Sequence, residues 1–136
     1  MDLEAEGANL SIDELRRLHS KKTGALITAA VRTAAVLSGA TGEQLPSLTA
    51  YAEKLGLAFQ IVDDVLDEEG DTANLGKTAG KDAAQHKATF PSLLGLEESK
   101  ARAAELVESA KSDLGTFGPS ADPLRAIAGF VLDRKS

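Results

Sequence analysis

Three aspartates interrupt the most apolar stretch of the chain, residues 55–71. Gln60, Asp63, Asp64 and Asp67 are spaced i, i+3, i+4 and i+7, so a helix would carry all four side chains on one face. The apolar residues between them would pack the opposite side of that helix. Carboxylates at this spacing repel one another, and near a helix C-terminus they also meet the negative end of the helix dipole. The pattern therefore predicts a bound cation with oxygen ligands, most simply Mg²⁺ on the three aspartates.

The same spacing also fits a solvated acidic face at a helix end, with no metal. Two other motif interpretations are excluded by register. An EF-hand loop with Gly70 at its sixth position would begin at Val65, which cannot bind calcium. A P-loop ending in Gly76-Lys77-Thr78 would require glycine at position 71, which is Asp71.

Composition limits the class of protein. The 136 residues are 43% hydrophobic, which predicts one globular domain over 1–136. A net charge of −6 and the lack of a basic, aromatic-rich patch argue against a nucleic-acid partner. There is no cysteine, so thiolate metal sites are excluded. No apolar run is long enough for a membrane span and the acidic N-terminus is not a signal peptide, so we expect a cytoplasmic protein without a membrane partner.

Abundant alanine and leucine with little alternation predict an all-α fold of about five to six helices. The third of these helices begins at a capping box made by Thr41 and Gln44 and carries the aspartates. Gly56 inside it indicates a close helix crossing, and Pro123 opens the last helix. The expected helical ranges are 11–20, 25–38, 41–68, a short segment within 89–95, 98–114, and a last helix from 123.

Lysines accompany the acidic stripe in sequence. Residues 69–88 are predicted to form a long polar loop, and loops of this length usually serve a function. It contains Lys77, Lys81 and Lys87. Lys22 and Thr23, in a predicted interruption at 21–24, offer an ammonium group and a hydroxyl to an anion. Both sets also fit ordinary solvated residues, but carboxylates with a metal and several lysines together suit a polyphosphate.

Five segments in order resemble the trans-isoprenyl diphosphate synthases, in particular the bacterial farnesyl diphosphate synthase (geranyltranstransferase) type, and the similarity covers essentially the whole chain. They are Lys-Thr-Gly-Ala-Leu-Ile at 22–27, Phe-Gln-Ile-Val-Asp-Asp-Val-Leu-Asp at 59–67, Gly-Asp at 70–71, Gly-Lys at 76–77 and Lys-Ala-Thr-Phe-Pro at 87–91.

The resemblance implies part of an isoprenoid-synthase helical bundle and a role for each candidate residue. Asp63, Asp64 and Asp67 match the second aspartate-rich motif, which holds Mg²⁺ on the allylic diphosphate. Thr23 and Gln60 match polar groups near the allylic carbon, where their dipoles would stabilise a carbocation. The positions that match contacts to the diphosphate are Lys22, Lys77 and Lys87. The implied catalytic set is Lys22, Thr23 and Gln60, and the implied reaction is prenyl transfer from an allylic diphosphate to isopentenyl diphosphate, giving farnesyl diphosphate.

The sequence departs from that family in one large respect. The first aspartate-rich motif and the groups that bind isopentenyl diphosphate belong to an N-terminal half that these 136 residues do not contain. We therefore expect the C-terminal portion of a synthase, inactive alone, with exposed apolar faces on residues 25–38 and on the third helix that favour a homo-oligomer or a missing N-terminal half as partner. The alternatives are a non-catalytic helical module for oligomerisation or diphosphate binding, and a terpene cyclase relative, although the metal-binding NSE pattern of cyclases is not evident.

Overall fold

The computed structural model describes residues 12–73 and 89–135, with the backbone alone at 12, 13, 15–20 and 71–73. Over these residues the fold is all-α, as predicted, and contains no strand. No helix of the described residues has the length and apolar character needed to cross a membrane. The elements are α2 (Ile12–Leu37), α3 (Gln44–Ala73), α5 (Phe90–Leu94), α6 (Leu96–Ser112), a 3₁₀ turn η1 (Pro119–Ala121) and α7 (Asp122–Asp133).

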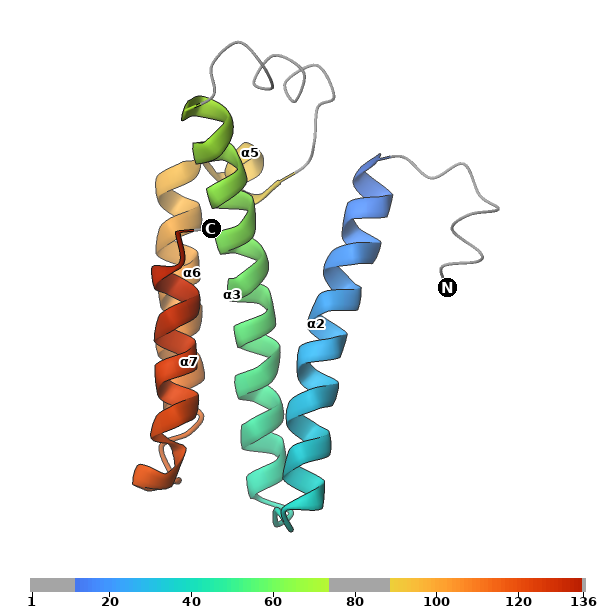
Figure 1. Cartoon of the computed structure of the whole chain (residues 1–136), viewed down its shortest axis with the longest axis vertical. Coiled ribbons are helices and arrows are strands. Elements are labelled where there is room, and N and C mark those ends of the chain that lie inside the picture. Colours follow the sequence, from blue (N-terminus) through green and yellow to red (C-terminus); the bar gives the residue numbers. More distant parts are fainter. Residues whose placement is uncertain (1–11, 74–88, 136) are drawn as a thin grey trace, which may run out of the picture.

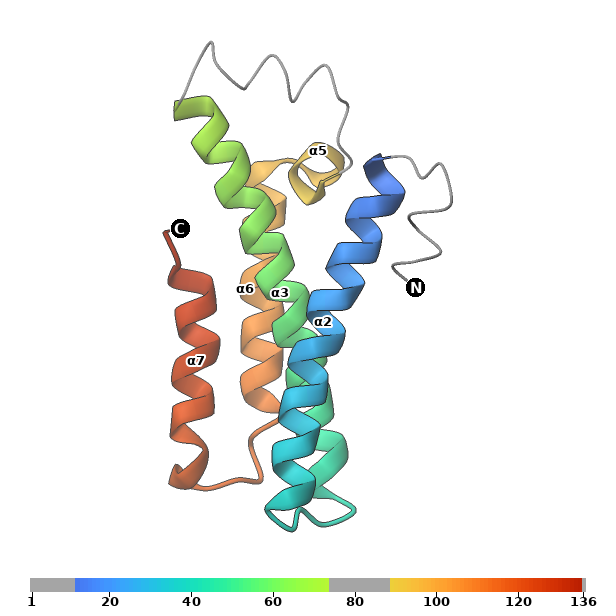
Figure 2. The same ribbon diagram turned by 45° about the vertical axis from the view of Figure 1, so that its right-hand side comes forward.

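Helix α3 is the centre of the arrangement. It packs against α2 on one side and against α6 and α7 on the other, and the short α5 lies near its C-terminal half (Figures 1 and 2). Helices α2 and α3 run antiparallel from the turn at 38–43 and diverge toward the N-terminal end of α2. The other helices are therefore arranged around α3, the helix that carries the aspartates.

The start of α3 confirms the predicted capping box, but its end differs from the prediction. The Thr41 N–H donates to Gln44 Oε1 at 2.9 Å, and the Gln44 N–H donates to Thr41 Oγ1 at 3.2 Å. The helix continues to Ala73, so residues 69–73 are helical and do not belong to a loop. The only helix breaker there is Gly70, and one interior glycine costs about 1 kcal/mol, which a packed helix tolerates. The rest of the predicted loop lies outside the described residues.

The predicted interruption at 21–24 is wrong, because α2 runs unbroken from Ile12 to Leu37. The two helices expected there are one, so the described residues form five α-helices. Gly24, in the interior of α2, contacts α3: a methyl group added at Gly56 would lie 3.2 Å from the Gly24 Cα. The close crossing predicted at Gly56 is therefore present, and its partner is the glycine that suggested a break.

The core lies on the α6 and α7 side of α3. One buried group, which includes Tyr51, Leu55, Val107 and Leu114, joins α3 to α6 and α7; a second, around Ile61 and Val65, lies nearer α5. The buried Tyr51 hydroxyl donates to the Leu124 carbonyl at 2.6 Å. This hydrogen bond ties α7 to the helix that carries the aspartates.

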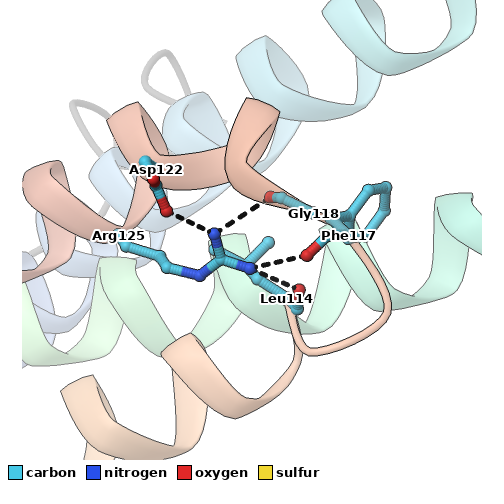
Figure 3. Close-up of polar contacts among 5 residues, drawn as sticks. All are labelled: Leu114, Phe117, Gly118, Asp122 and Arg125. Atoms are coloured by element: carbon cyan, nitrogen blue, oxygen red, sulfur yellow. Dashed lines mark hydrogen bonds and ion pairs between the residues drawn. The ribbon is translucent and has the colours of Figure 1, made fainter.

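A second polar contact fixes the turn between α6 and α7. The Arg125 guanidinium donates to the carbonyls of Leu114, Phe117 and Gly118 at 2.8–3.1 Å, and it pairs with Asp122 at 2.7 Å (Figure 3). Carbonyl groups beyond a helix C-terminus lack intrahelical partners, and a cation satisfies several of them at once. Arg125 thus determines the direction in which α7 returns along α3.

Exposed apolar side chains lie on the outer helices. On α2, Leu26 is 71% exposed and Leu37 is 83% exposed, as expected for the face of residues 25–38. The expectation of an exposed apolar side on the third helix is mostly wrong, since Leu57 is the large apolar residue of α3 with substantial exposure, at 44%. Phe130 on α7, at 69%, was not anticipated.

Candidate functional site

The four polar residues of α3 share one stretch of helix but have different surroundings. Asp64 is buried, Gln60 and Asp63 are half-buried, and Asp67 is exposed. The stripe predicted from the i, i+3, i+4, i+7 spacing therefore spans from the protein interior to solvent. The three carboxylates therefore differ: Asp64 is buried against α5, Asp63 pairs with a residue beyond α7, and Asp67 is exposed to solvent.

Asp64 connects α3 to α5. Its Oδ2 accepts from the backbone N–H of Phe90 at 3.2 Å, and its Oδ1 accepts from Gln60 Nε2 at 3.5 Å. Phe90 is the first residue of α5, and the first N–H groups of a helix lack intrahelical partners. A carboxylate is favoured there because it accepts such a hydrogen bond next to the positive end of the helix. The segment that begins at residue 89 is thus positioned by one of the predicted metal ligands.

Asp63 pairs with a residue from the end of the chain. Its Oδ1 accepts from Arg134 Nη2 at 2.9 Å, and the Arg134 guanidinium carbon lies 4.3 Å from the centre of the Phe59 ring. The Arg134 side chain is 13% exposed and that of Asp63 is 43% exposed. Stacking on an aromatic face and pairing with a carboxylate are both typical of arginine. Within the structure, the cation predicted to neutralise this stripe is therefore supplied in part by the protein itself.

Asp63, Asp64 and Asp67 do not converge on one point. Among the described residues, no three acidic or histidine side chains are close enough to one another to hold a metal ion. Asp63 and Asp67 are one helical turn apart and carry exposed or half-exposed oxygens, which suits a hard divalent cation that retains several waters. Both oxygens of Asp64 accept hydrogen bonds. The donor set thus fits Mg²⁺ at Asp63 and Asp67, and the assignment of the metal to all three aspartates stays a prediction.

Lys22 and Thr23 lie on α2 beside the close helix crossing. Lys22 is exposed and Thr23 is half-buried, and both directly precede Gly24. Gly24 contacts Gly56 of α3, and Gln60 is one turn further along α3 from Gly56. The glycine contact therefore brings the backbone of Thr23 and that of the helical turn bearing Gln60 to the same crossing.

The remaining residues of the predicted site lie outside the described part of the chain. Lys77 and Lys87, together with Lys81, lie within residues 74–88, outside the described part of the chain. Arg134 is the polar group that sequence reasoning missed. Its only sequence signal is a cation just after the last predicted helix, in a chain whose net charge is −6.

A small cleft adjoins this region of α3. It has a volume of about 260 Å³ and an apolar lining that includes Val62, Leu66 and Leu132. Arg134 lines it as well, and so does Glu69, which forms an ion pair with Lys100 at 3.4 Å. Arg134 therefore separates the acidic stripe from an apolar cleft.

The profile of the Polyprenyl synthetase family matches residues 1–116. The chain therefore belongs to this family, which confirms the resemblance drawn from its motifs.

Individual relatives are synthases of prenyl diphosphates. The chain is 45% identical over 138 residues to the farnesyl diphosphate synthase of Escherichia coli, covering 98% of this chain and 46% of that protein. It is 48% identical over 134 residues to the dimethylallyltranstransferase of Fischerella ambigua, covering 98% of this chain and 39% of that protein. The crystal structure of an FPP/GFPP synthase from Zymomonas mobilis superposes with a TM-score of 0.72 at 39% identity, covering 96% of this chain and 42% of that one. The chain thus spans less than half the length of these relatives.

Proposed function

We propose that this chain forms the part of a prenyltransferase that binds the allylic diphosphate and Mg²⁺, in an enzyme that condenses an allylic diphosphate with isopentenyl diphosphate to give farnesyl diphosphate. The observation that carries the proposal is the pair of carboxylates Asp63 and Asp67, half-buried and exposed on one face of α3, in a chain of the Polyprenyl synthetase family. Relatives named farnesyl diphosphate synthase, at 45% identity, support the choice of product class. A cytoplasmic location and a homo-oligomer stay predictions.

In this proposal the residues of α3 have separate tasks. Asp63 and Asp67 hold the metal, and Asp64 orients the Gln60 amide and the start of α5 through its two hydrogen bonds. When bound, Mg²⁺ neutralises negative charge on the leaving diphosphate. Asp64 is the least exposed of the three carboxylates, so its task is positional.

The polar groups near the helix crossing act on the organic part of the substrate. The Thr23 hydroxyl and the Gln60 amide are neutral dipoles whose oxygens stabilise positive charge that develops on the allylic carbon. The Lys22 side chain is exposed on α2, and the family resemblance assigns its ammonium group to the diphosphate. Lys77 and Lys87 remain in this set through the family resemblance alone.

Ligand-induced stabilisation tests the binding site. We expect millimolar Mg²⁺ with inorganic diphosphate to raise the melting temperature of the purified protein, because a ligand at 100 times its Kd stabilises the folded state by about 2.7 kcal/mol. Asp67→Asn should reduce the shift strongly without disturbing a hydrogen bond of the fold. Glu105→Gln, which removes an exposed carboxylate from α6, serves as the matched control and should retain the full shift. An equal shift in wild type and Asp67→Asn would remove Asp67 from the site.

A turnover assay separates the enzyme from a non-catalytic binding module. We expect the 136-residue chain alone, given geranyl diphosphate, radiolabelled isopentenyl diphosphate and Mg²⁺, to make little farnesyl diphosphate. Its sequence holds a single aspartate-rich stripe, and the loss of a positioned nucleophile removes an effect worth about 7–11 kcal/mol. Product that appears after a partner carrying the first aspartate-rich motif is added would support the proposal. Ligand binding that never leads to turnover, with any such partner, would favour the module.

A further inference from the structure

Arg134 is a nearly buried charged side chain that the proposed chemistry does not use. It donates to Asp63 at 2.9 Å, stacks on Phe59 and is 13% exposed. It also lines the apolar cleft beside Leu66 and Leu132. One side chain thus connects the acidic stripe, an aromatic ring and a cleft, although it comes from the end of the chain.

Arg134 occupies Oδ1 of Asp63, a carboxylate that a divalent metal would also use. Magnesium binds carboxylate oxygens at about 2.1 Å, so it would place a second cation next to the guanidinium on one half-buried carboxylate, where the two cations repel each other. We propose that Arg134 is a resident counter-ion of Asp63 that a divalent cation displaces, so that metal binding releases the C-terminal end of the chain from α3.

The backbone determines which partner moves. Asp63 lies in the interior of the 30-residue helix α3, whose backbone is held by its own hydrogen bonds and by its neighbours. Arg134 follows the last residue of α7 and has an extended backbone, with φ −56° and ψ 144°. An exchange of partners at the Asp63 carboxylate therefore displaces Arg134 and leaves α3 in place.

Release of Arg134 has a structural consequence. The guanidinium covers one face of Phe59 and part of the lining of the 260 Å³ cleft, so both become more open when it leaves. Metal binding at Asp63 is thereby coupled to exposure of the adjoining apolar surface. This inference rests on the proposed role of Asp63 as a metal ligand.

Metal affinity gives the first test, with Mn²⁺ alone as the probe and free Mn²⁺ measured by electron paramagnetic resonance. We expect Arg134→Gln to bind Mn²⁺ about three- to tenfold more tightly than wild type, since the competing ion pair is lost. Arg134→Lys, which keeps the charge without the planar stacking group, should lie between them. Arg102→Gln removes a positive charge from an exposed position on α6 and should leave the affinity unchanged.

Mobility of the C-terminus gives a second, independent test. The chain has no cysteine, so Ser136→Cys introduces a unique site for a fluorescent label. We expect Mg²⁺ to lower the anisotropy of this label in the wild-type background, and Arg134→Gln to lower it before any metal is added. Circular dichroism of each variant checks that the helical fold is retained.

The outcomes separate this inference from the proposed function. Metal bound by wild type, with equal or weaker affinity in Arg134→Gln and an unchanged label, would overturn the role of Arg134 and leave the metal site intact. No metal bound by either protein would overturn both. Metal bound by Arg134→Gln alone would show that Arg134 blocks the site and is not displaced, which would overturn the exchange and leave the metal site intact.

Discussion

Substitution of Gly56 by alanine isolates the contact that brings α2 and α3 together. The added methyl group would lie 3.2 Å from the Gly24 Cα, whereas carbon atoms attract best at about 3.5–4.0 Å. Helix α2 must therefore move away by about 0.5 Å. Overpacking of this kind costs about 1–3 kcal/mol, and the better helix propensity of alanine returns about 1 kcal/mol. We expect Gly56→Ala to lower the free energy of unfolding by about 1 kcal/mol.

The control lies at the same crossing. A methyl group at Gly24 would meet no atom within 4 Å, so Gly24→Ala gains helix propensity without a clash and should raise stability by about 1 kcal/mol. Urea unfolding measures both variants; with a slope of about 2 kcal/mol/M, their midpoints should move by about 0.5 M in opposite directions. The reasoning fails if Gly56→Ala is stabilised as much as Gly24→Ala.

Three further predictions concern other residues of the fold. Burial raises the pKa of Tyr51, the only tyrosine in a chain without tryptophan, so tyrosinate absorbance should titrate with a midpoint above pH 10. The stability that this pKa shift contributes is complete below pH 10 and is lost as the pH rises through the raised pKa. Tyr51→Phe should lower the free energy of unfolding by about 1–2 kcal/mol at neutral pH and abolish this alkaline loss of stability. A variant whose stability has the same pH profile as wild type would contradict this prediction. Asp64→Ala should lower the free energy of unfolding by about 1–3 kcal/mol, because the backbone N–H of Phe90 loses its acceptor. Asp67→Ala should change it by less than about 0.5 kcal/mol. Equal effects in chemical unfolding would refute the distinction between a buried Asp64 and an exposed Asp67. Phe130→Ser should weaken self-association in light scattering, and a monodisperse wild-type monomer at high concentration would exclude that interface.

Local signals allowed most of the helices to be predicted; the break at 21–24 and the end of α3 were the exceptions. The box made by Thr41 and Gln44 involves residues three apart, and the structure places it as expected. The segment from Lys21 to Gly24 predicts a break because glycine disfavours helices on its own. The compensating contact with Gly56 lies 32 positions along the chain and leaves no local trace.

The surroundings of the candidate site were harder to predict because its contacts are distant in sequence. The i, i+3, i+4, i+7 pattern identified the face of α3, but it did not separate a buried Asp64 from an exposed Asp67. That difference arises from Phe90, which is 26 positions away. The pairing of Asp63 with Arg134 spans 71 positions, and it depends on the direction of α7 after the turn that Arg125 fixes.

The glycine contact between α2 and α3 also determines how a change in helix angle would affect the candidate site. Gln60 is four residues beyond Gly56, which is about 6 Å along the helix, and Thr23 is adjacent to Gly24. A tilt of about 5° about the contact displaces a point 6 Å away by about 0.5 Å, but it moves Leu37, about 20 Å from Gly24, by about 1.7 Å. The exposed end of α2 can therefore adjust to whatever packs against it, while the separation of Thr23 from Gln60 stays almost constant.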